Sequence, residues 1–308
     1  MALWEERDDL RMTEAEFRML CDLLRGYCGL HFGPEARYVL EKRLVRRARE
    51  LGADSFTAYH YLLRHDSSGD QELARLVDEL VTNETYFFRE RNQLRALFEE
   101  ILPDLRARSP RRSLSLWSAG CSGGEEPYTL VMLALEAGLE PGRDLRVYAS
   151  DISRPMLQKA RRGLYREASF RQTEPALREK YFLEKDGVWR ISDDVKMHVD
   201  FIHLNLLDRS KVALLGTMDV TLCRNVIIYF GIETKQKVIQ TLDEKLRPGG
   251  YLLLGHSESL INISSAFELR HLKHDLVYRK PAPGDSPYDP WHAAAAAAVA
   301  RVEAGEER

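Results

Sequence analysis

Apolar positions recur every three or four residues along residues 12–100, and this spacing predicts a series of short amphipathic helices. Glycines or clusters of Ser and Asp separate the helical segments, which read FRMLCDLLRGY, EARYVLEKRLVRRARELG, SFTAYHYLLR and ELARLVDELVTNETYFF. Thr13 and Glu16 have the spacing of a capping box in front of the first segment. We therefore expect an N-terminal helical domain over residues 1–102, followed by a linker at the polar, proline-containing stretch 103–113.

From Leu114 the pattern changes to short apolar runs that alternate with amphipathic segments. The runs predicted as strands are LSLWS, LRVYAS, FIHLNLL, MDVTLC and YLLLGH. Helices are expected over residues 125–137, 154–163 and 233–246, the last closed by RPGG. Alternating strands and helices predict an α/β domain over residues 114–280, with a mainly parallel sheet covered on both faces. The segment FELRHLKHDLVYRK predicts an antiparallel hairpin at its edge.

Two stretches lie outside this alternation. Residues 181–200 hold two β-like runs around Asp186-Gly187, a pair typical of tight turns, and predict a small antiparallel β insertion. Residues 281–308 contain prolines, six consecutive alanines and mixed charges, and we expect a flexible tail there.

Composition narrows the classes of protein. The chain has 308 residues, of which 44% are hydrophobic and 30% charged, as in ordinary globular proteins. A net charge of −3 provides no bulk attraction to nucleic acid or anionic lipid. The start MALWEERDDLRM lacks an apolar signal-peptide core, and no apolar run approaches the ~18 residues of a membrane span. The four cysteines form no CxxC pair, so we expect reduced thiols in a cytoplasmic protein without metal ligands of that type.

The stretch WSAGCSGGEEPY at residues 117–128 combines a strand end, a glycine-rich turn and a helix start. Its glycines let the backbone approach a ligand closely, as in dinucleotide sites. However, Glu125 and Glu126 stand where a pyrophosphate would need bare amides, and their charge would repel it. These acids suit a ligand with ammonium or hydroxyl groups; the alternative is that they only stabilise the first helical turn.

Polar residues also follow the next predicted strands. Asp151 follows the second strand, Asn205 lies at the end of the third, and Cys223-Arg224-Asn225 ends the fourth. Ligands of open α/β sheets bind at the carboxyl ends of the strands, where an acid can bind both ribose hydroxyls. An adenosine that carries an amino-acid tail and no phosphate fits, which is S-adenosylmethionine. Asp151 as a helix cap, Asn205 as a turn residue and Cys223 as a buried apolar residue are the structural alternatives.

Several motifs of the chain resemble those of a known protein family. LVTNETYFFRE, GCSGGEEPY, YASDIS, LNLLD, CRNVIIYF and RPGGYLLLGHSESL are similar to the corresponding motifs of the CheR-type chemotaxis-receptor glutamate methyltransferases, in the same order over residues 12–280. The resemblance implies a helical domain followed by a Rossmann-like class I methyltransferase domain. It implies methyl transfer from S-adenosylmethionine to glutamate carboxylates of receptors, which leaves S-adenosylhomocysteine.

The resemblance also implies roles for single residues. It implies cofactor contacts by Asn83, Thr85, Arg89, Glu125 or Glu126, Asp151, Asn205, Leu206, Cys223, Arg224 and Asn225. It makes Arg89 and Tyr229 the residues that hold the acceptor carboxylate. The alternatives are a surface arginine, a core tyrosine, and a domain-junction cluster of Tyr86, Phe87 and Phe88.

The predicted helix at residues 35–51 carries a basic arc opposite its apolar face. The arc consists of Lys42, Arg43, Arg46, Arg47 and Arg49. By resemblance, this arc docks the glutamate-rich, cytoplasmic helical domain of a chemotaxis receptor; the alternative is a solvated face. In some relatives the β insertion binds a receptor tail peptide, and the sequence leaves that open here.

Three other functions compete with receptor methylation. A methyltransferase acting on nucleic acid or small-molecule amines often has an Asn- or Asp-Pro-Pro-aromatic motif where this chain has CRNVIIYF. The presence of Arg89, Asp151 and Tyr229 argues against a non-catalytic cofactor-binding module. A nicotinamide-dependent enzyme would need the GxGxxG fingerprint, which the turn lacks.

Overall fold

The computed structural model of the protein describes residues 10–285. The chain divides into two compact units. The first unit ends at Thr82 and also contains Tyr229–Thr234, and the second runs over Asn83–Ile228 and resumes at Lys235. None of the helices within residues 10–285 combines the length and the apolar character needed to cross a membrane.

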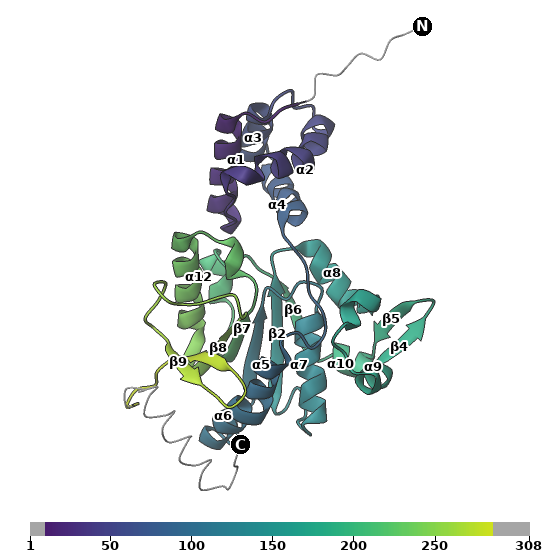
Figure 1. Cartoon of the computed structure of the whole chain (residues 1–308), viewed down its shortest axis with the longest axis vertical. Coiled ribbons are helices and arrows are strands. Elements are labelled where there is room, and N and C mark those ends of the chain that lie inside the picture. The colour runs from purple at the N-terminus through teal and green to yellow at the C-terminus, as the bar shows by residue number, and fades with distance from the viewer. Residues whose placement is uncertain (1–9, 286–308) are drawn as a thin grey trace, which may run out of the picture. The chain divides into compact units, whose positions relative to one another are not determined.

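The first unit is helical (Figure 1). Its helices are α1 (Glu14–Cys28), the 3-10 helix η1 (Pro34–Ala36), α2 (Arg37–Glu50), α3 (Phe56–His65) and α4 (Gly69–Leu80). The predicted capping box at the start of α1 is confirmed: the amide of Glu16 donates to the Thr13 hydroxyl at 3.3 Å, and the amide of Thr13 donates to the Glu16 carboxylate at 2.9 Å. That carboxylate also accepts the amide of Thr57 in α3 at 2.9 Å. Glu16 therefore joins the beginnings of two helices.

The apolar face predicted for α2 is buried over most of its length. Leu40, Leu44 and Ala48 are no more than 1% exposed. Leu51 continues the same apolar spacing but is 38% exposed, because α2 ends at Glu50 and Leu51 lies in the turn that follows.

The boundary between the two units differs from the expected linker at residues 103–113. Three consecutive helical segments cover much of the region after the boundary, namely α5 (Arg91–Ala96), the π-helix η2 (Leu97–Ile101) and α6 (Leu102–Arg108). They pack in the second unit, where Gln93 donates to the carbonyl of Leu254 at 2.9 Å and Tyr251 donates to Asp104 at 3.1 Å. The stretch TNETYFF, which we grouped with the preceding helix, lies beyond the end of α4 and is not helical.

A mixed sheet forms the centre of the second unit. Its strands are β1 (Leu114–Ala119), β2 (Leu145–Asp151), β6 (Val199–His203), β7 (Met218–Cys223), β8 (Leu246–Leu254), β9 (Glu268–His271) and β10 (Leu276–Arg279). Within residues 10–285 they pair in the order β6-β2-β1-β7-β8-β10-β9. The first five are parallel, whereas β10 and β9 form the predicted antiparallel hairpin at the edge.

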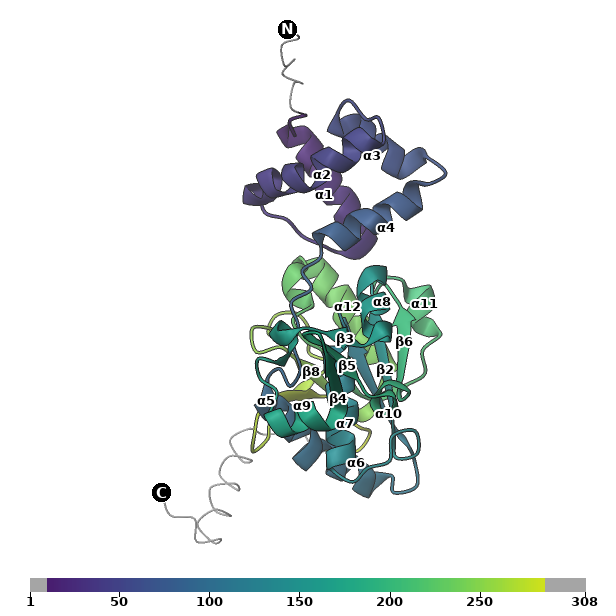
Figure 2. The same ribbon diagram turned by 90° about the vertical axis from the view of Figure 1, so that its right-hand side faces the viewer.

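Helices cover both faces of this sheet. They are α7 (Glu125–Glu136), α8 (Arg154–Arg162) and α12 (Ile232–Lys245), while the short helices α11 (Arg209–Ala213) and η4 (Ile227–Tyr229) follow β6 and β7 along the chain. Figures 1 and 2 show α7 and α8 on one side of the sheet and α12 on the other. The motif RPGG ends α12 as predicted, but it lies inside β8, which begins directly at Leu246.

The β insertion is confirmed as a separate antiparallel sheet (Figure 2). Its strands pair in the order β3-β5-β4, and they are β3 (Leu164–Tyr165), β4 (Phe182–Lys185) and β5 (Val188–Ile191). Short helices flank them, namely η3 (Glu167–Phe170), α9 (Pro175–Tyr181) and α10 (Asp193–Lys196). The predicted turn has φ of 52° at Asp186 and 73° at Gly187, as a two-residue hairpin turn requires.

Candidate functional site

Residues 120–124, the Gly-rich turn, connect β1 to α7. Gly120 and Gly124 both have a φ of 88°, a left-handed conformation that favours glycine. A Cβ on Gly120 would lie 2.4 Å from Cγ2 of Val226, so this glycine also allows close approach to the segment after β7. We call that segment, residues 224–228, the β7 loop. Glycine thus brings the loops after two neighbouring strands together.

Asp151 ends β2 beside the Gly-rich turn and is 8% exposed. Its Oδ2 accepts the amide of Ser122 at 2.7 Å, and its Oδ1 accepts the amide of Ser153 at 2.8 Å. The alternative considered for Asp151, a helix cap before α8, falls instead to Ser153, whose hydroxyl accepts the amide of Met156. Asp151 instead ties the turn after β1 to the turn after β2, so its carboxylate is held at the rim of the sheet.

The two acids of the Gly-rich motif have different surroundings. Glu125 is fully buried; its Oε1 accepts from Lys159 at 2.9 Å and from Ser169 at 3.1 Å, while its Oε2 has no hydrogen-bond partner. Glu126 accepts from the hydroxyl of Ser118 at 2.6 Å and from Arg224 at 3.0 Å. Burial raises the pKa of Glu126, against the opposing effect of Arg224. Only Glu126 is joined to the β7 loop.

Arg224 links the β7 loop to the segment after α4. Its guanidinium donates to Glu126, to Glu90 at 2.9 and 3.2 Å, and to the carbonyl of Arg89 at 2.7 Å. Its side chain is 3% exposed. A buried guanidinium needs such partners, because an unpaired charge in the interior is costly. Arg224 therefore fixes Glu90 and Glu126 side by side.

The predicted cofactor segment, residues 83–89, lies next to the Gly-rich turn. The hydroxyl of Ser122 donates to the carbonyl of Asn83 at 3.3 Å. Asn83 and Thr85 are both half-buried. Phe87 and Phe88 of the segment are both buried. Phe87 packs in a ring cluster with Tyr165, Phe170 and Phe182, and its ring centroid lies 4.8 to 5.3 Å from theirs. These two phenylalanines thus belong to the core of the second unit rather than to a domain junction.

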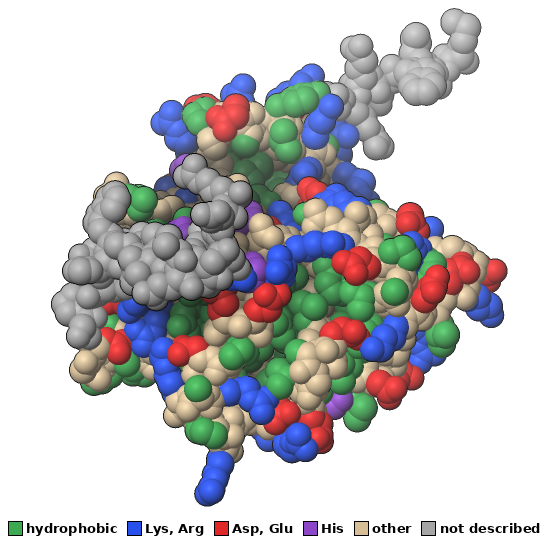
Figure 3. Space-filling view, turned by 60° about the horizontal axis from the view of Figure 1, so that its bottom comes forward, with side chains coloured by type: hydrophobic (Ala, Val, Ile, Leu, Met, Phe, Trp, Pro, Cys, Tyr) green, Lys and Arg blue, Asp and Glu red, His purple; other side chains and the backbone are tan. Residues whose placement is uncertain are grey.

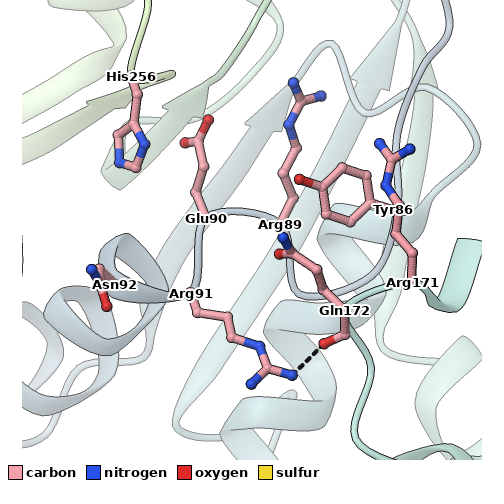
Figure 4. A pocket seen from close by; sticks show the side chains of 8 residues that line it. All are labelled: Tyr86, Arg89, Glu90, Arg91, Asn92, Arg171, Gln172 and His256. Atoms are coloured by element: carbon pink, nitrogen blue, oxygen red, sulfur yellow. Dashed lines mark hydrogen bonds between the residues drawn. The ribbon is translucent and has the colours of Figure 1, made fainter.

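A cavity of about 750 Å³ opens beside this segment (Figure 4). It is lined by residues 86 and 89–92, by Arg171 and Gln172, and by His256. Tyr86 lies between two arginines, with the Arg171 guanidinium 3.8 Å and the Arg89 guanidinium 5.5 Å from its ring centroid. Positive side chains therefore dominate one wall of the cavity.

Arg89 differs from the other arginines of the cavity. Arg171 pairs with Glu84 at 2.7 Å, and Arg91 pairs with Glu174 and donates to the carbonyl of Gln172. Arg89 donates only to the carbonyl of Glu84, at 3.1 Å, and within the described part of the chain no carboxylate forms an ion pair with it. Its guanidinium keeps donors for a ligand.

The remaining rim residues are placed as follows. Asn205 follows β6, and its side-chain oxygen accepts the amide of Leu207 at 3.0 Å, so the turn role is present. Leu206 is 8% exposed and Cys223 is fully buried. Asn225 has a φ of 58°, and its buried Oδ1 has no hydrogen-bond partner. That oxygen is an acceptor available to a bound group.

Tyr229 belongs to the first unit. Its carbonyl accepts the amide of His31 at 2.9 Å, next to an isolated bridge between Leu30 and Phe230. Its side chain is half-buried, as a cleft tyrosine or a core tyrosine would be.

The basic arc of α2 is not uniform. Arg47 donates to both carboxylate oxygens of Glu72, at 2.7 and 2.5 Å, and Glu72 also accepts from Tyr59 at 3.1 Å. Although burial acts to raise the pKa of Glu72, the hydrogen bonds from Arg47 and Tyr59 lower it overall. Arg47 is therefore engaged inside the helical unit.

The other members of the arc are exposed. Lys42, Arg43, Arg46 and Arg49 lie on the surface of α2. Arg43 donates to the carbonyls of Glu79 and Leu80 at the end of α4, and Arg46 donates to Glu50 at 3.4 Å. An exposed ion pair such as that of Arg46 with Glu50 contributes little to stability.

Two residues of the site, Glu90 and Glu258, were not identified from the sequence. Glu90 follows Arg89 directly, yet its partner Arg224 is 134 residues away. Glu258 lies in the motif GHSES and accepts backbone amides of the β7 loop. An acid soon after a predicted strand end was the available signal for Glu258.

The site fits a phosphate-free nucleoside ligand. A Gly-rich turn flanked by acids, a carboxylate at the end of β2 and a free acceptor at Asn225 provide for hydroxyl and ammonium groups. The basic residues at the start of α7, Lys159 and Arg224, are both engaged by its acids, Glu125 and Glu126.

Comparison with known proteins agrees with this geometry. Residues 83–276 match the CheR methyltransferase, SAM binding domain, and residues 15–81 match the CheR methyltransferase, all-alpha domain. Chemotaxis protein methyltransferase 2 of Vibrio cholerae is 38% identical over 281 residues, which cover 91% of this chain and 97% of that protein. The Escherichia coli K12 chemotaxis protein methyltransferase is 34% identical, covering 87% and 92% of the two chains.

Among solved structures, magnesium protoporphyrin IX methyltransferase from Synechocystis with bound SAM is 17% identical at a TM-score of 0.34, covering 72% of this chain and 94% of that one. The family matches carry the assignment, and S-adenosylmethionine is the cofactor. The chain belongs to the CheR family of S-adenosylmethionine-dependent methyltransferases, which methylate chemotaxis receptors.

Proposed function

We propose that this enzyme esterifies glutamate side chains in the cytoplasmic helical domain of a chemotaxis receptor. The observation that carries the choice of a carboxylate acceptor is Arg89, a half-buried arginine that lines the 750 Å³ cavity and has no ion pair among the described residues. A guanidinium with free donors in a cavity is suited to bind an anionic side chain. An amine acceptor would be repelled there.

The cofactor residues divide by chemistry. Asp151 is assigned the ribose hydroxyls, since it stands at the carboxyl end of β2. Of the two acids, Glu126 is the better candidate for the cofactor side, because it lies beside Ser118 and Arg224 whereas Glu125 is fully buried against Lys159.

The other assignments rest on the family motifs. Asn205 and Leu206 flank the adenine, and Cys223, Arg224 and Asn225 form the wall below the transferred methyl group. Asn83 and Thr85 bind the amino-acid portion, and the backbone of Asn83 already contacts the Gly-rich turn.

Methyl transfer to a carboxylate needs alignment more than proton transfer. Bound S-adenosylmethionine supplies a methyl group on a positively charged sulfur, and its loss leaves S-adenosylhomocysteine. A glutamate carboxylate is ionised near neutral pH, so the protein needs no general base to activate it. Arg89 orients that carboxylate, and Tyr229 is assigned the same task from its motif alone.

The hold on the acceptor has to be loose. A bidentate arginine pair would stabilise the acceptor carboxylate and reduce its reactivity. Contacts that are equally strong in the ground state and the transition state do not accelerate the chemical step. Arg89 already donates one hydrogen bond to the carbonyl of Glu84, and its guanidinium lies over the ring of Tyr86. These contacts restrict the orientations in which it can bind the acceptor carboxylate. Placing the reacting atoms about 3–3.5 Å apart is the main contribution expected of the site.

The test uses the full chain, methyl-labelled S-adenosylmethionine and purified receptor signalling domains. Label that is released by mild base identifies a glutamate ester, and mass spectrometry locates it. Label on RNA or on amines would replace the proposal with the alternative acceptor. On the face shown in Figure 3, basic and acidic side chains of the second unit are interspersed rather than gathered by sign, unlike a typical phosphate-backbone surface.

The cofactor assignments have a paired test. Asp151→Ala should abolish cofactor binding measured by calorimetry, and near-normal affinity would refute the ribose role. Glu126→Gln should weaken cofactor binding by about tenfold, the size of one charge-assisted hydrogen bond. Glu125→Gln is the matched control, and equal losses in both variants would contradict the choice of Glu126.

A further inference from the structure

The carboxylate of Glu258 is surrounded by backbone amides. Its Oε2 accepts from Asn225 and from Gly255, each at 2.7 Å. Its Oε1 accepts from Val226 at 2.9 Å and from Ile228 at 3.2 Å. One side chain thus satisfies four amides, two on each oxygen, and all of them belong to the second unit.

These amides come from the loops that follow β7 and β8, two adjacent parallel strands. Apart from that of Ile228 in η4, these amides lie outside helices and strands, and buried amides left unpaired are costly. The two loops are also in direct contact: a Cβ on Gly255 would lie 2.8 Å from Nδ2 of Asn225 and 3.0 Å from its amide nitrogen. Glu258 fills the place that a backbone acceptor would take in a longer strand pair.

Two further carboxylates hold the first residue of the β7 loop. Glu126 and Glu90 bind Arg224, the first residue of the loop. Between the two attachments lies Asn225, with a φ of 58° and its buried Oδ1 unpartnered. A non-glycine residue in that conformation persists only where its surroundings impose it. The amide of Asn225 bound to Glu258 is one of those constraints.

We propose that Glu258 is a positioning residue for methyl transfer, which holds the β7 loop in the conformation that the reaction uses. It acts through the backbone of the loop and touches neither cofactor nor acceptor. The role depends on a carboxylate, because only acceptor oxygens suit four converging donors. Burial raises the pKa of Glu258, and the four amides act in the opposite direction, in favour of the ionised form.

The decisive variant is Glu258→Gln, which keeps the shape of the side chain but replaces one acceptor oxygen with an NH₂ group. That group would face two amide donors, so half of the attachment is lost. Glu258→Asp keeps both acceptors on a shorter side chain. Glu100→Gln is the matched control, because Glu100 also accepts two backbone amides, from Lys273 at 2.8 Å and His274 at 3.2 Å, at the turn between β9 and β10.

Initial rates are measured at saturating cofactor on receptor domains, alongside cofactor affinity and melting temperature. Glu258→Gln is expected to lower kcat by about 10- to 100-fold, the scale of a misplacement near 1 Å in an active site. Glu258→Asp should recover part of that loss. Glu100→Gln should keep a kcat within about twofold of the unmodified protein. A kcat for folded Glu258→Gln as high as that of Glu100→Gln would overturn the proposal and leave a purely structural carboxylate.

The rate measurement rests on the proposed function, because it uses receptor domains as the acceptor. Hydrogen exchange tests the role of Glu258 without that assumption. In the unmodified protein, the amides of Asn225, Val226, Ile228 and Gly255 should exchange slowly whatever the acceptor is. Exchange at the rate of an unstructured peptide would overturn the proposal even if Glu258→Gln fails to fold. Absence of receptor methylation by the unmodified protein would count against the proposed function instead.

Discussion

Arg47 and Arg89 both stand out in the sequence as candidates for function, yet their surroundings are opposite. Arg47 in the helical unit binds both oxygens of Glu72 and also donates to Glu50 at 3.0 Å. Arg89 in the methyltransferase unit donates to one carbonyl and lies near Tyr86 in an open cavity.

The difference lies in how many donors each guanidinium has left. A bidentate pair with a buried carboxylate uses the planar edge of the arginine and fixes its position, so Arg47 serves the fold. Arg89 retains most of its five donors. The same residue type thus has its donors occupied by a carboxylate in one unit and mostly unoccupied in the other, and only the partners tell the two arginines apart.

The largest expected effect is on catalysis. Arg89→Ala should reduce kcat by about 100- to 1,000-fold, the loss typical of removing a preorganised donor from an active site. Cofactor affinity should fall less than the rate. Arg95→Ala is the control, because Arg95 is an exposed arginine paired with Glu99 on the same stretch of helix. Rates are measured with labelled cofactor, and a rate within threefold of normal would make Arg89 a structural residue like Arg47.

The second prediction concerns stability. Arg47→Met should lower the unfolding free energy of the helical unit by about 2 to 3 kcal/mol. The cause is that Glu72, whose side chain is 7% exposed, loses its counter-charge. This loss is at or below the lower limit usual for removing one partner of a buried ion pair. Urea unfolding measures this loss. Methyl transfer per folded molecule should be unchanged, and a selective loss of rate would return Arg47 to the receptor-binding set.

A smaller effect is expected in acid. The folded pKa of Glu72 lies below its ordinary value of 4.5, so its ionised form contributes stability above pH 4.5 that is lost as the pH falls through the folded pKa. The melting temperature of the helical unit should therefore fall below about pH 4.5, more steeply than in Glu72→Gln. Parallel pH curves for the two proteins would contradict the assignment of this pair.

The smallest effect is expected for the exposed part of the basic arc. Reversal of Lys42 and Arg46 to Glu should weaken receptor binding by several-fold at low salt, and less at high salt, because rim charges act mainly through the association rate. Arg18→Glu on α1 is a control, since Arg18 is equally exposed and lies outside the arc. If all variants bind receptor domains equally in a salt series, the arc is a solvated face.

Local patterns predicted the parts of the fold that local physics determines. The capping box at Thr13 and the turn at Asp186-Gly187 each depend on a few neighbouring residues, and each strand could be recognised from its own short apolar run. The polar residues at the rim could be named because parallel strands end at one edge.

Long-range partners were beyond the same reasoning. The periodicity up to residue 100 predicts helix but not that Gln93 reaches Leu254, 161 residues away, so the unit boundary at Thr82 was missed. Glu90 and Glu258 were passed over because their partners are backbone amides or an arginine distant in sequence. The choice between Glu125 and Glu126 likewise depended on which side chain meets Arg224.

The carboxylate of Glu16 has a consequence for how the helical unit opens. It closes the first turn of α1 and also holds the amide of Thr57 in α3. Fraying of α1 from its beginning would therefore release α3 as well. A protease that needs a locally opened segment should cut at both places together or at neither.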